Sequence, residues 1–153
     1  MSLFTVVEIR AVCCALAALL APDRQLRGGR LKAATLTINI EHVRNAAGVV
    51  GVLVFNSPRG WPENFDAALR KKAVAAHPPV TALVIDDLPY GNYAVVVLHD
   101  ENENRKLDRN FLGIPREGWG MSNNPRARAS APSFRRARFT LARDKNLRVR
   151  LNY

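Results

Sequence analysis

Apolar and polar residues alternate along several short segments after residue 34, and a period of two is typical of half-buried β-strands. The first segment, TLTINIEHV at 35–43, alternates in this way. A turn is predicted at 45–48, and the nearly continuous apolar run VVGVLVF follows at 49–55. Together these segments predict an opening hairpin.

The next part of the chain predicts one short helix and an edge strand. SPRGWP at 57–62 breaks the alternation. ENFDAALRKK at 63–72 has acidic residues early and basic residues late, as the dipole of a short helix favours. An edge strand is predicted at 73–77, and Pro78-Pro79 ends it because proline donates no ladder hydrogen bond.

Two further strands are predicted before the chain turns polar. A strand at 81–85 leads into a strong turn signal at 86–92, DDLPYGN. The segment YAVVVLH at 93–99 is the richest in apolar β-branched residues, so it predicts the central strand.

Regular patterning resumes only near the end of the chain, in ARFTL at 137–141 and LRVRLN at 147–152, which predict a final hairpin around Asp144 and Lys145. Six or seven short strands with one helix indicate an all-β fold. We therefore predict a single antiparallel Greek-key β-sandwich of about seven strands over residues 35–153, with one short helix and a long ordered loop.

Residues 1–34 are predicted to be a signal peptide, or an N-terminal hydrophobic segment, followed by a linker. The run AVCCALAALLA at 11–21 has the length of a signal-peptide core and is shorter than the roughly 20 residues of a membrane-spanning helix. Glu8 cancels Arg10, so the preceding positive region is weak, and an uncleaved helix or a mis-assigned start codon are the alternatives. Export to the periplasm or exterior is the expectation, and a mature domain would contain no cysteine, since Cys13 and Cys14 both lie in this run.

The net charge of +10 is concentrated in the last third of the chain. Residues 105–153 carry thirteen basic and three acidic residues, whereas residues 1–104 balance to zero. A basic surface of this kind favours an acidic polymer or another anionic surface as partner. The alternative is an ordinary solvated surface, and no specific nucleic-acid motif is present because no aromatic residues interleave with the arginines.

The long polar loop begins with a segment, DENENRKLD at 100–108, that has the ligand spacing of an EF-hand-like calcium loop. Side-chain oxygens of alternate residues and one backbone carbonyl would bind Ca²⁺: Asp100, Asn102, Asn104, Lys106 (carbonyl) and Asp108. Arg105 stands where glycine is usual, and Phe111 stands where a bidentate glutamate is usual. The alternative is a turn whose Asn and Asp side chains cap the loop's own backbone.

The rest of the loop, up to Asn124, has two interpretations. One is the rim of a binding site, to which the following residues would contribute: His99, Asn110, Phe111, Glu117, Trp119, Ser122, Asn123 and Asn124. The other is a self-packed loop in which Phe111, Ile114 and Trp119 anchor the chain on the sheet.

The run LPYGNYAVVVLHDENENRKLDRNFLGIPREGWGMSNNP, which ends at Pro125, resembles a bacterial family of exported proteins, domain of unknown function 2141. Its members share the pattern LPPGxYAvxxxHDxNxNxKxDxNFxGxPxEGxGxSNN, and the similarity extends from about Leu36 to Tyr153. The resemblance implies a transthyretin-like or related sandwich and a secreted or periplasmic setting, with no known activity. Members commonly have glycine where this chain has Arg105, which weakens the metal interpretation here.

No catalytic motif is apparent, since the chain contains no nucleophile elbow, metalloprotease helix or phosphate loop. We therefore expect a non-catalytic binding or envelope-associated module. The alternatives are a calcium-stabilised structural accessory domain and a small hydrolase centred on His99 and Glu117.

Overall fold

The computed structural model describes residues 32–126 and 130–153. The predicted export segment and both cysteines lie outside these residues. Within the described ranges, none of the helices is long and apolar enough to cross a membrane.

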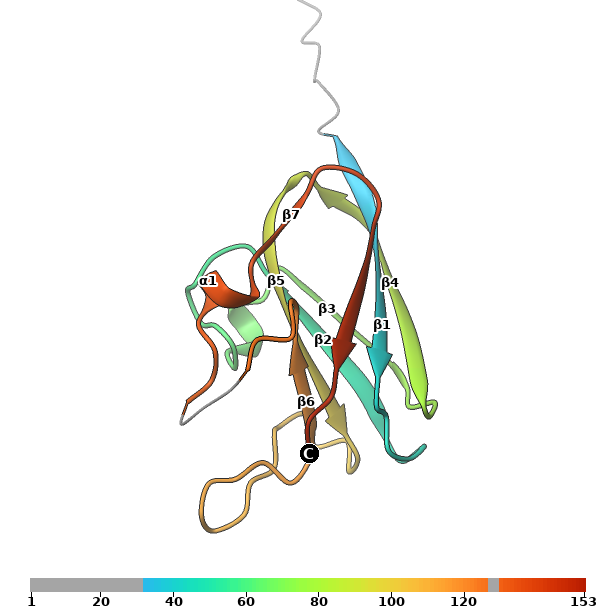
Figure 1. The fold of residues 1–153 in the computed structure, drawn as a ribbon, viewed down its shortest axis with the longest axis vertical. Coiled ribbons are helices and arrows are strands. Elements are labelled where there is room, and N and C mark those ends of the chain that lie inside the picture. Colours follow the sequence, from blue (N-terminus) through green and yellow to red (C-terminus); the bar gives the residue numbers. More distant parts are fainter. Residues whose placement is uncertain (1–31, 127–129) are drawn as a thin grey trace, which may run out of the picture. The chain divides into compact units, whose positions relative to one another are not determined.

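The fold consists of eight strands in two sheets (Figure 1). The strands are β1 (Ala33–Glu41), β2 (Val49–Phe55), β3 (Arg70–Ala75), β4 (Val80–Pro89), β5 (Gly91–Asp100), β6 (Gly118–Met121), β7 (Phe139–Leu141) and β8 (Lys145–Arg150). One sheet has the order β4-β1-β8, and the other has the order β3-β2-β5-β6, with β7 also paired to β5. Every pairing of these strands is antiparallel except that of β1 with β8. The predicted all-β sandwich is confirmed.

The hydrophobic core lies between the two sheets. Alternate residues of β1 and β2 are buried, as the period of two predicts. Ile38 and Ile40 of β1 belong to the same buried cluster as Val52 and Val54 of β2. Burial of one face of each sheet is what fixes the register of these strands.

Both predicted hairpins are wrong. The segments of the opening hairpin became β1 and β2, which lie in different sheets, and those of the final hairpin became β7 and β8, which also lie in different sheets. The alternating pattern determines which face of a strand is buried, but it does not determine which strand is its hydrogen-bonded neighbour.

The predicted helix at 63–72 is also wrong. The chain forms only a 3-10 helix at Phe65–Ala67, where the Asn64 side chain accepts from two backbone N–H groups. Strand β3 then begins at Arg70, so the edge strand starts before the predicted residue 73. Pairing with β2 extends this strand into residues whose local pattern favours a helix.

The turn signal at 86–92 is only partly correct, because β4 continues to Pro89. Asp87 has a φ of 51°, and the β1–β4 register shifts opposite Asp86 and Asp87. The two aspartates therefore form a β-bulge, and the chain turns only at Tyr90.

Two elements were not predicted. Strand β6 lies inside the predicted loop, and helix α1 (Phe134–Ala137) precedes β7. A Cβ atom at Gly118 would overlap the Tyr153 ring, and one at Gly120 would overlap the Arg150 backbone. The strand thus requires glycine at these two positions, and because glycine is also typical of loops, the sequence pattern assigned them to the loop.

Candidate functional site: an apolar groove and a self-capped loop

The outer face of the five-stranded sheet, away from the core, is apolar. Leu53, Val96, Leu98 and Trp119 lie on this face and are all half-buried. The solvent face of an antiparallel sheet is usually polar, so this face needs a covering.

One part of the face is covered by the chain itself. Trp61 packs edge-on against Phe55 and Phe134, with ring centroids 5.3 and 5.8 Å apart, respectively. Its indole N–H donates to the Pro132 carbonyl at 2.9 Å. Ala94, Met121 and Ala137 are buried beneath this cover.

The other part of the face is an open groove of about 1070 Å³. Its floor includes Leu53, Val96, Leu98 and Trp119, and one wall is formed by Leu107 and residues 112–115 of the loop between β5 and β6. Gly51, opposite Leu98, adds no side chain to the floor, and a Cβ placed there would meet only the Leu98 carbonyl oxygen, at 3.9 Å. A glycine inside a strand often marks a place that another molecule approaches closely.

The rim of the groove has an excess of basic residues: Lys71, Lys72, Arg105, Lys106 and Arg109, against Glu63, Asp100 and Glu103. Arg109 forms an ion pair with Glu63 at 2.8 Å. Arg105 and Lys106 form no ion pair with any residue that the structure describes. An anionic group at this end of the groove would therefore find two available cations.

The predicted metal ligands come together, but they bond to one another. Asp100 accepts the backbone N–H groups of Asn104 and Arg105, at 3.0 and 2.6 Å. Both carboxylate oxygens of Asp108 accept side-chain amide hydrogens, from Asn102 at 2.8 Å and Asn104 at 3.0 Å. No group of three or more His, Cys, Asp or Glu side chains suited to a metal occurs within residues 32–126 and 130–153. The loop is thus capped by its own side chains. The side-chain amides of Asn102 and Asn104 point their N–H groups, not their oxygens, towards Asp108.

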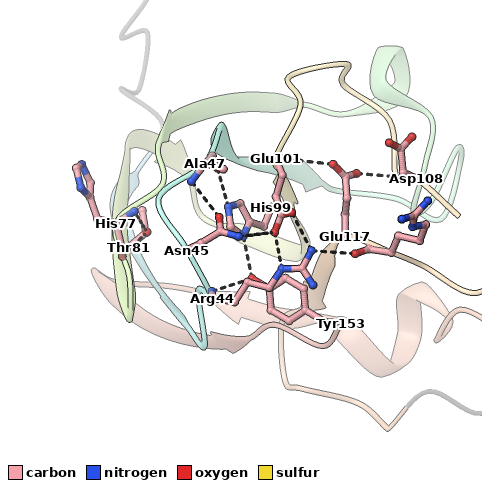
Figure 2. A network of polar contacts seen from close by, with 11 residues as sticks. Arg44, Asn45, Ala47, His77, Thr81, His99, Glu101, Asp108, Glu117 and Tyr153 are labelled. Carbon is pink, nitrogen blue, oxygen red and sulfur yellow. Dashed lines mark hydrogen bonds and ion pairs between the residues drawn. The ribbon is translucent and has the colours of Figure 1, made fainter.

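Glu117 closes the base of this loop (Figure 2). It is 4% exposed, and its two oxygens accept the backbone N–H groups of Glu101 and Asp108, each at 3.0 Å. Next to it, Arg44 binds Glu101 through two hydrogen bonds, at 2.6 and 2.8 Å. The hydrogen bond from Arg44 lowers the pKa of Glu101 below its usual value. These contacts join both ends of the loop to the segment between β1 and β2.

His99 is fully buried, and both of its ring nitrogens have partners (Figure 2). Its Nε2 lies 2.9 Å from the Ala47 carbonyl oxygen, which can only accept, so Nε2 carries the hydrogen. In the neutral ring, Nδ1 then accepts from the Tyr153 hydroxyl, which lies 2.8 Å away. Burial raises the pKa of Tyr153. His99 thus holds the β1–β2 connection and Tyr153 together.

Four other predicted contact residues also bind backbone. Ser122 is buried between Val95 and Ala137, and its hydroxyl donates to the Ala137 carbonyl at 2.6 Å. Asn123 donates to two carbonyls near α1, and Asn124 clamps β8 through two bonds. Asn110 accepts from the N–H groups of Leu112 and Ile114. All four side chains therefore form hydrogen bonds that stabilise the local backbone.

The predicted anchoring by Phe111 and Ile114 is wrong. Phe111 is 94% exposed and Ile114 is 54% exposed, whereas Trp119 does pack on the sheet. The loop is held by polar bonds to its own backbone, so it does not need these side chains as anchors.

The groove therefore includes only three of the predicted site residues, Asp100, Lys106 and Trp119. The floor residues Leu53, Val96 and Leu98 were missed because their segments read as continuous apolar strands with no exposed face. Gly51 within VVGVLVF was the one available signal of a close approach.

The fold and this site define a two-sheet β-domain with an apolar groove on one outer face and a self-capped loop beside it. Residues 38–150 match the family described as "Uncharacterized protein conserved in bacteria (DUF2141)", and the chain belongs to that family. The resemblance drawn from the loop motif is thus confirmed, while its transthyretin-like detail stays a prediction. The comparisons with curated proteins and with solved structures each gave no match.

Proposed function

We propose that the protein is a non-catalytic binding module whose binding site is the groove on the outer face of the five-stranded sheet. The observation that carries this proposal is the size and apolar floor of the groove, about 1070 Å³ over Leu53, Val96, Leu98 and Trp119. Pockets for small molecules are concave and mostly apolar, with a few polar groups at defined places. The cations Arg105 and Lys106 at one end favour an elongated apolar ligand with an anionic end.

Filling the groove from its floor tests the proposal. Gly51→Phe adds a ring where only the Leu98 carbonyl oxygen is near, so the core stays intact while the groove is blocked. The matched control is Ala82→Phe, which adds the same ring to an exposed position of β4 on the other sheet.

The probe is anilinonaphthalene sulfonate, an aromatic anion whose fluorescence rises in apolar surroundings, with dodecanoate as competitor. We expect saturable binding by the wild-type chain and the Ala82→Phe variant, and binding weaker by about tenfold or more in Gly51→Phe. Equal affinity in all three proteins would refute the groove as the site.

The environment of the two candidate catalytic residues supports a non-catalytic role over a hydrolase. His99 has no exposed surface, and Glu117 already accepts two backbone hydrogen bonds. A general base must reach the proton that it removes, directly or through one water. Hydrolytic turnover by the purified chain that is lost in His99→Ala would reverse this conclusion.

The second candidate function is a calcium-stabilised loop, and the backbone at Arg105 favours it. Arg105 has a φ of 62°, which is the conformation that glycine supplies at the sixth position of EF-hand-like loops. Binding would require the amides of Asn102 and Asn104 to turn their oxygens towards the ion. An increase in melting temperature with Ca²⁺ that chelation reverses and Asp108→Asn abolishes would support this candidate; an unchanged melting temperature would exclude it.

Export of the chain is part of the same proposal, and it rests on the apolar run at 11–21. Fusing residues 1–34 to an alkaline phosphatase that is active only after export tests it. We expect activity from the native segment and little from Leu19→Arg, because a charge interrupts the apolar core. Equal activity from both fusions would contradict a role of this run in export.

A further inference from the structure

The loop between β5 and β6 ends in an exposed apolar tip, defined here as residues 111–114. This loop, orange in Figure 1, extends beyond the ends of the strands. Phe111 is 94% exposed, Leu112 is 68% exposed and Ile114 is 54% exposed. Single exposed apolar residues are common on protein surfaces, but three within four residues at the end of a projecting loop form a patch.

Hydrogen bonds hold the backbone of the tip. Asn110 donates its N–H to the Ile114 carbonyl at 2.8 Å, and its own carbonyl accepts from Gly113 at 2.9 Å. The Asn110 side chain accepts the N–H groups of Leu112 and Ile114, each at 3.0 Å. Arg109 donates to the Gly113 carbonyl and pairs with Glu63, which holds the tip to the rest of the domain. Gly113 has a φ of 76°, a conformation that few other residues adopt.

Because most of its peptide groups are already hydrogen-bonded, this tip can enter a weakly polar medium at a reduced cost. An unpaired peptide group costs several kcal/mol in the hydrocarbon of a bilayer. Three of the four N–H groups and two of the four carbonyls of the tip have partners, so its backbone carries a smaller penalty than an open loop would.

Basic residues surround the tip. The segment 105–116 contains Arg105, Lys106, Arg109 and Arg116 against one acidic residue, Asp108, so its net charge is +3. Arg105 and Lys106 have no ion-pair partner in the described part of the chain. An acidic polymer would explain the cations but not the exposed apolar side chains, whereas an anionic bilayer explains both.

We propose that residues 105–116 form a docking element for an anionic lipid bilayer. Phe111, Leu112 and Ile114 enter the interface between head groups and acyl chains, and Arg105 and Lys106 bind the anionic head groups. This element overlaps the groove, because Arg105, Lys106, Leu112 and Ile114 also line it. Gly51→Phe changes only the groove floor, so it should leave vesicle binding unchanged, and this keeps the two proposals distinguishable.

The test is sedimentation of the full chain with vesicles of pure phosphatidylcholine and with vesicles of equal parts phosphatidylcholine and phosphatidylglycerol. We expect binding to the anionic vesicles to exceed binding to the neutral ones. The double variant Arg105→Gln with Lys106→Gln should weaken it by about fivefold for each charge removed. The matched control, Arg143→Gln with Arg148→Gln, has the same net charge and should bind like the wild type.

Variants of the apolar tip residues distinguish binding to a bilayer from binding to an acidic polymer. Phe111→Ser with Leu112→Ser should weaken vesicle binding and leave binding to dextran sulfate unchanged, and Val80→Ser is the control for loss of an exposed apolar side chain elsewhere. In Phe111→Trp, the added indole should shift its emission to the blue on anionic vesicles. The wild type and all variants share residues 1–31, so differences in their vesicle binding report the contribution of the loop. Equal vesicle binding by the tip variant and the wild type, or no spectral shift, would overturn the proposal.

Discussion

Glu117 is predicted to be the main attachment of the long loop, and Glu117→Ala tests this role. The side chain is 4% exposed and accepts two backbone N–H groups, from Glu101 and Asp108. Hydrogen bonds to a charged group contribute about 1.5–3 kcal/mol each, and a buried donor left without a partner adds a penalty. Water reaching the loosened loop offsets part of this loss, so we expect the free energy of unfolding to fall by about 3 kcal/mol or more.

Urea unfolding followed by circular dichroism measures this change, and limited proteolysis reports whether the loop opens separately. Glu117→Gln keeps one acceptor oxygen and should fall between the alanine variant and the wild type. Glu103→Ala removes an exposed carboxylate from the same loop and should change stability by less than about 0.5 kcal/mol. If Glu117→Ala and Glu103→Ala have the same stability and the same cleavage pattern, Glu117 does not hold the loop.

Three further outcomes follow from the loop and its neighbours. Arg44 lowers the pKa of Glu101, so the Glu101 carboxylate stabilises the fold above its usual pKa of 4.5 and loses that contribution as the pH falls through the lower pKa of the folded state. Arg44→Met should therefore make the acid side of a curve of stability against pH shallower, and an unchanged curve would contradict this role of Arg44. Arg105 has a φ of 62°, so Arg105→Gly relieves backbone strain and should raise the free energy of unfolding by up to about 1 kcal/mol. A lower free energy of unfolding would show that the Arg105 side chain stabilises the fold by more than its backbone strain destabilises it. Gly48→Ala should destabilise the fold by about 2 kcal/mol or more in urea unfolding, because Gly48 has a φ of 61° and an added Cβ would overlap the Asp100 carbonyl. A neutral effect would show that the β1–β2 connection can shift.

The sequence predicted which residues form the sandwich better than it predicted their partners. Alternation in β1 placed Ile38 on the buried face, because burial depends on local period, whereas the continuous apolar run of β2 predicted a strand without showing which of its faces is buried. Pairing depends on the whole fold, and this is why both hairpins were wrong. Strand β6 was hidden by Gly118 and Gly120, whose absent side chains admit Tyr153 and Arg150.

The candidate site was predictable only in part. The loop at 100–108 stood out by its polar spacing, and its side chains do converge, but only coordinates show that Asp100 and Asp108 accept hydrogens from the loop itself. The groove could not be predicted, because it depends on which part of an apolar face Trp61 and Phe134 cover. No local pattern encodes that cover.

The groove above Gly51 is proposed to bind an apolar ligand with an anionic end. Titration of dodecanoate into the isotopically labelled full chain, followed by amide chemical shifts, tests it most directly. Binding in the groove should give saturable shifts at Gly51, Val96, Leu98 and Trp119, with little change at Asn39 and Arg148 on the other sheet. Shifts confined to the other sheet, or none at these four amides, would contradict it.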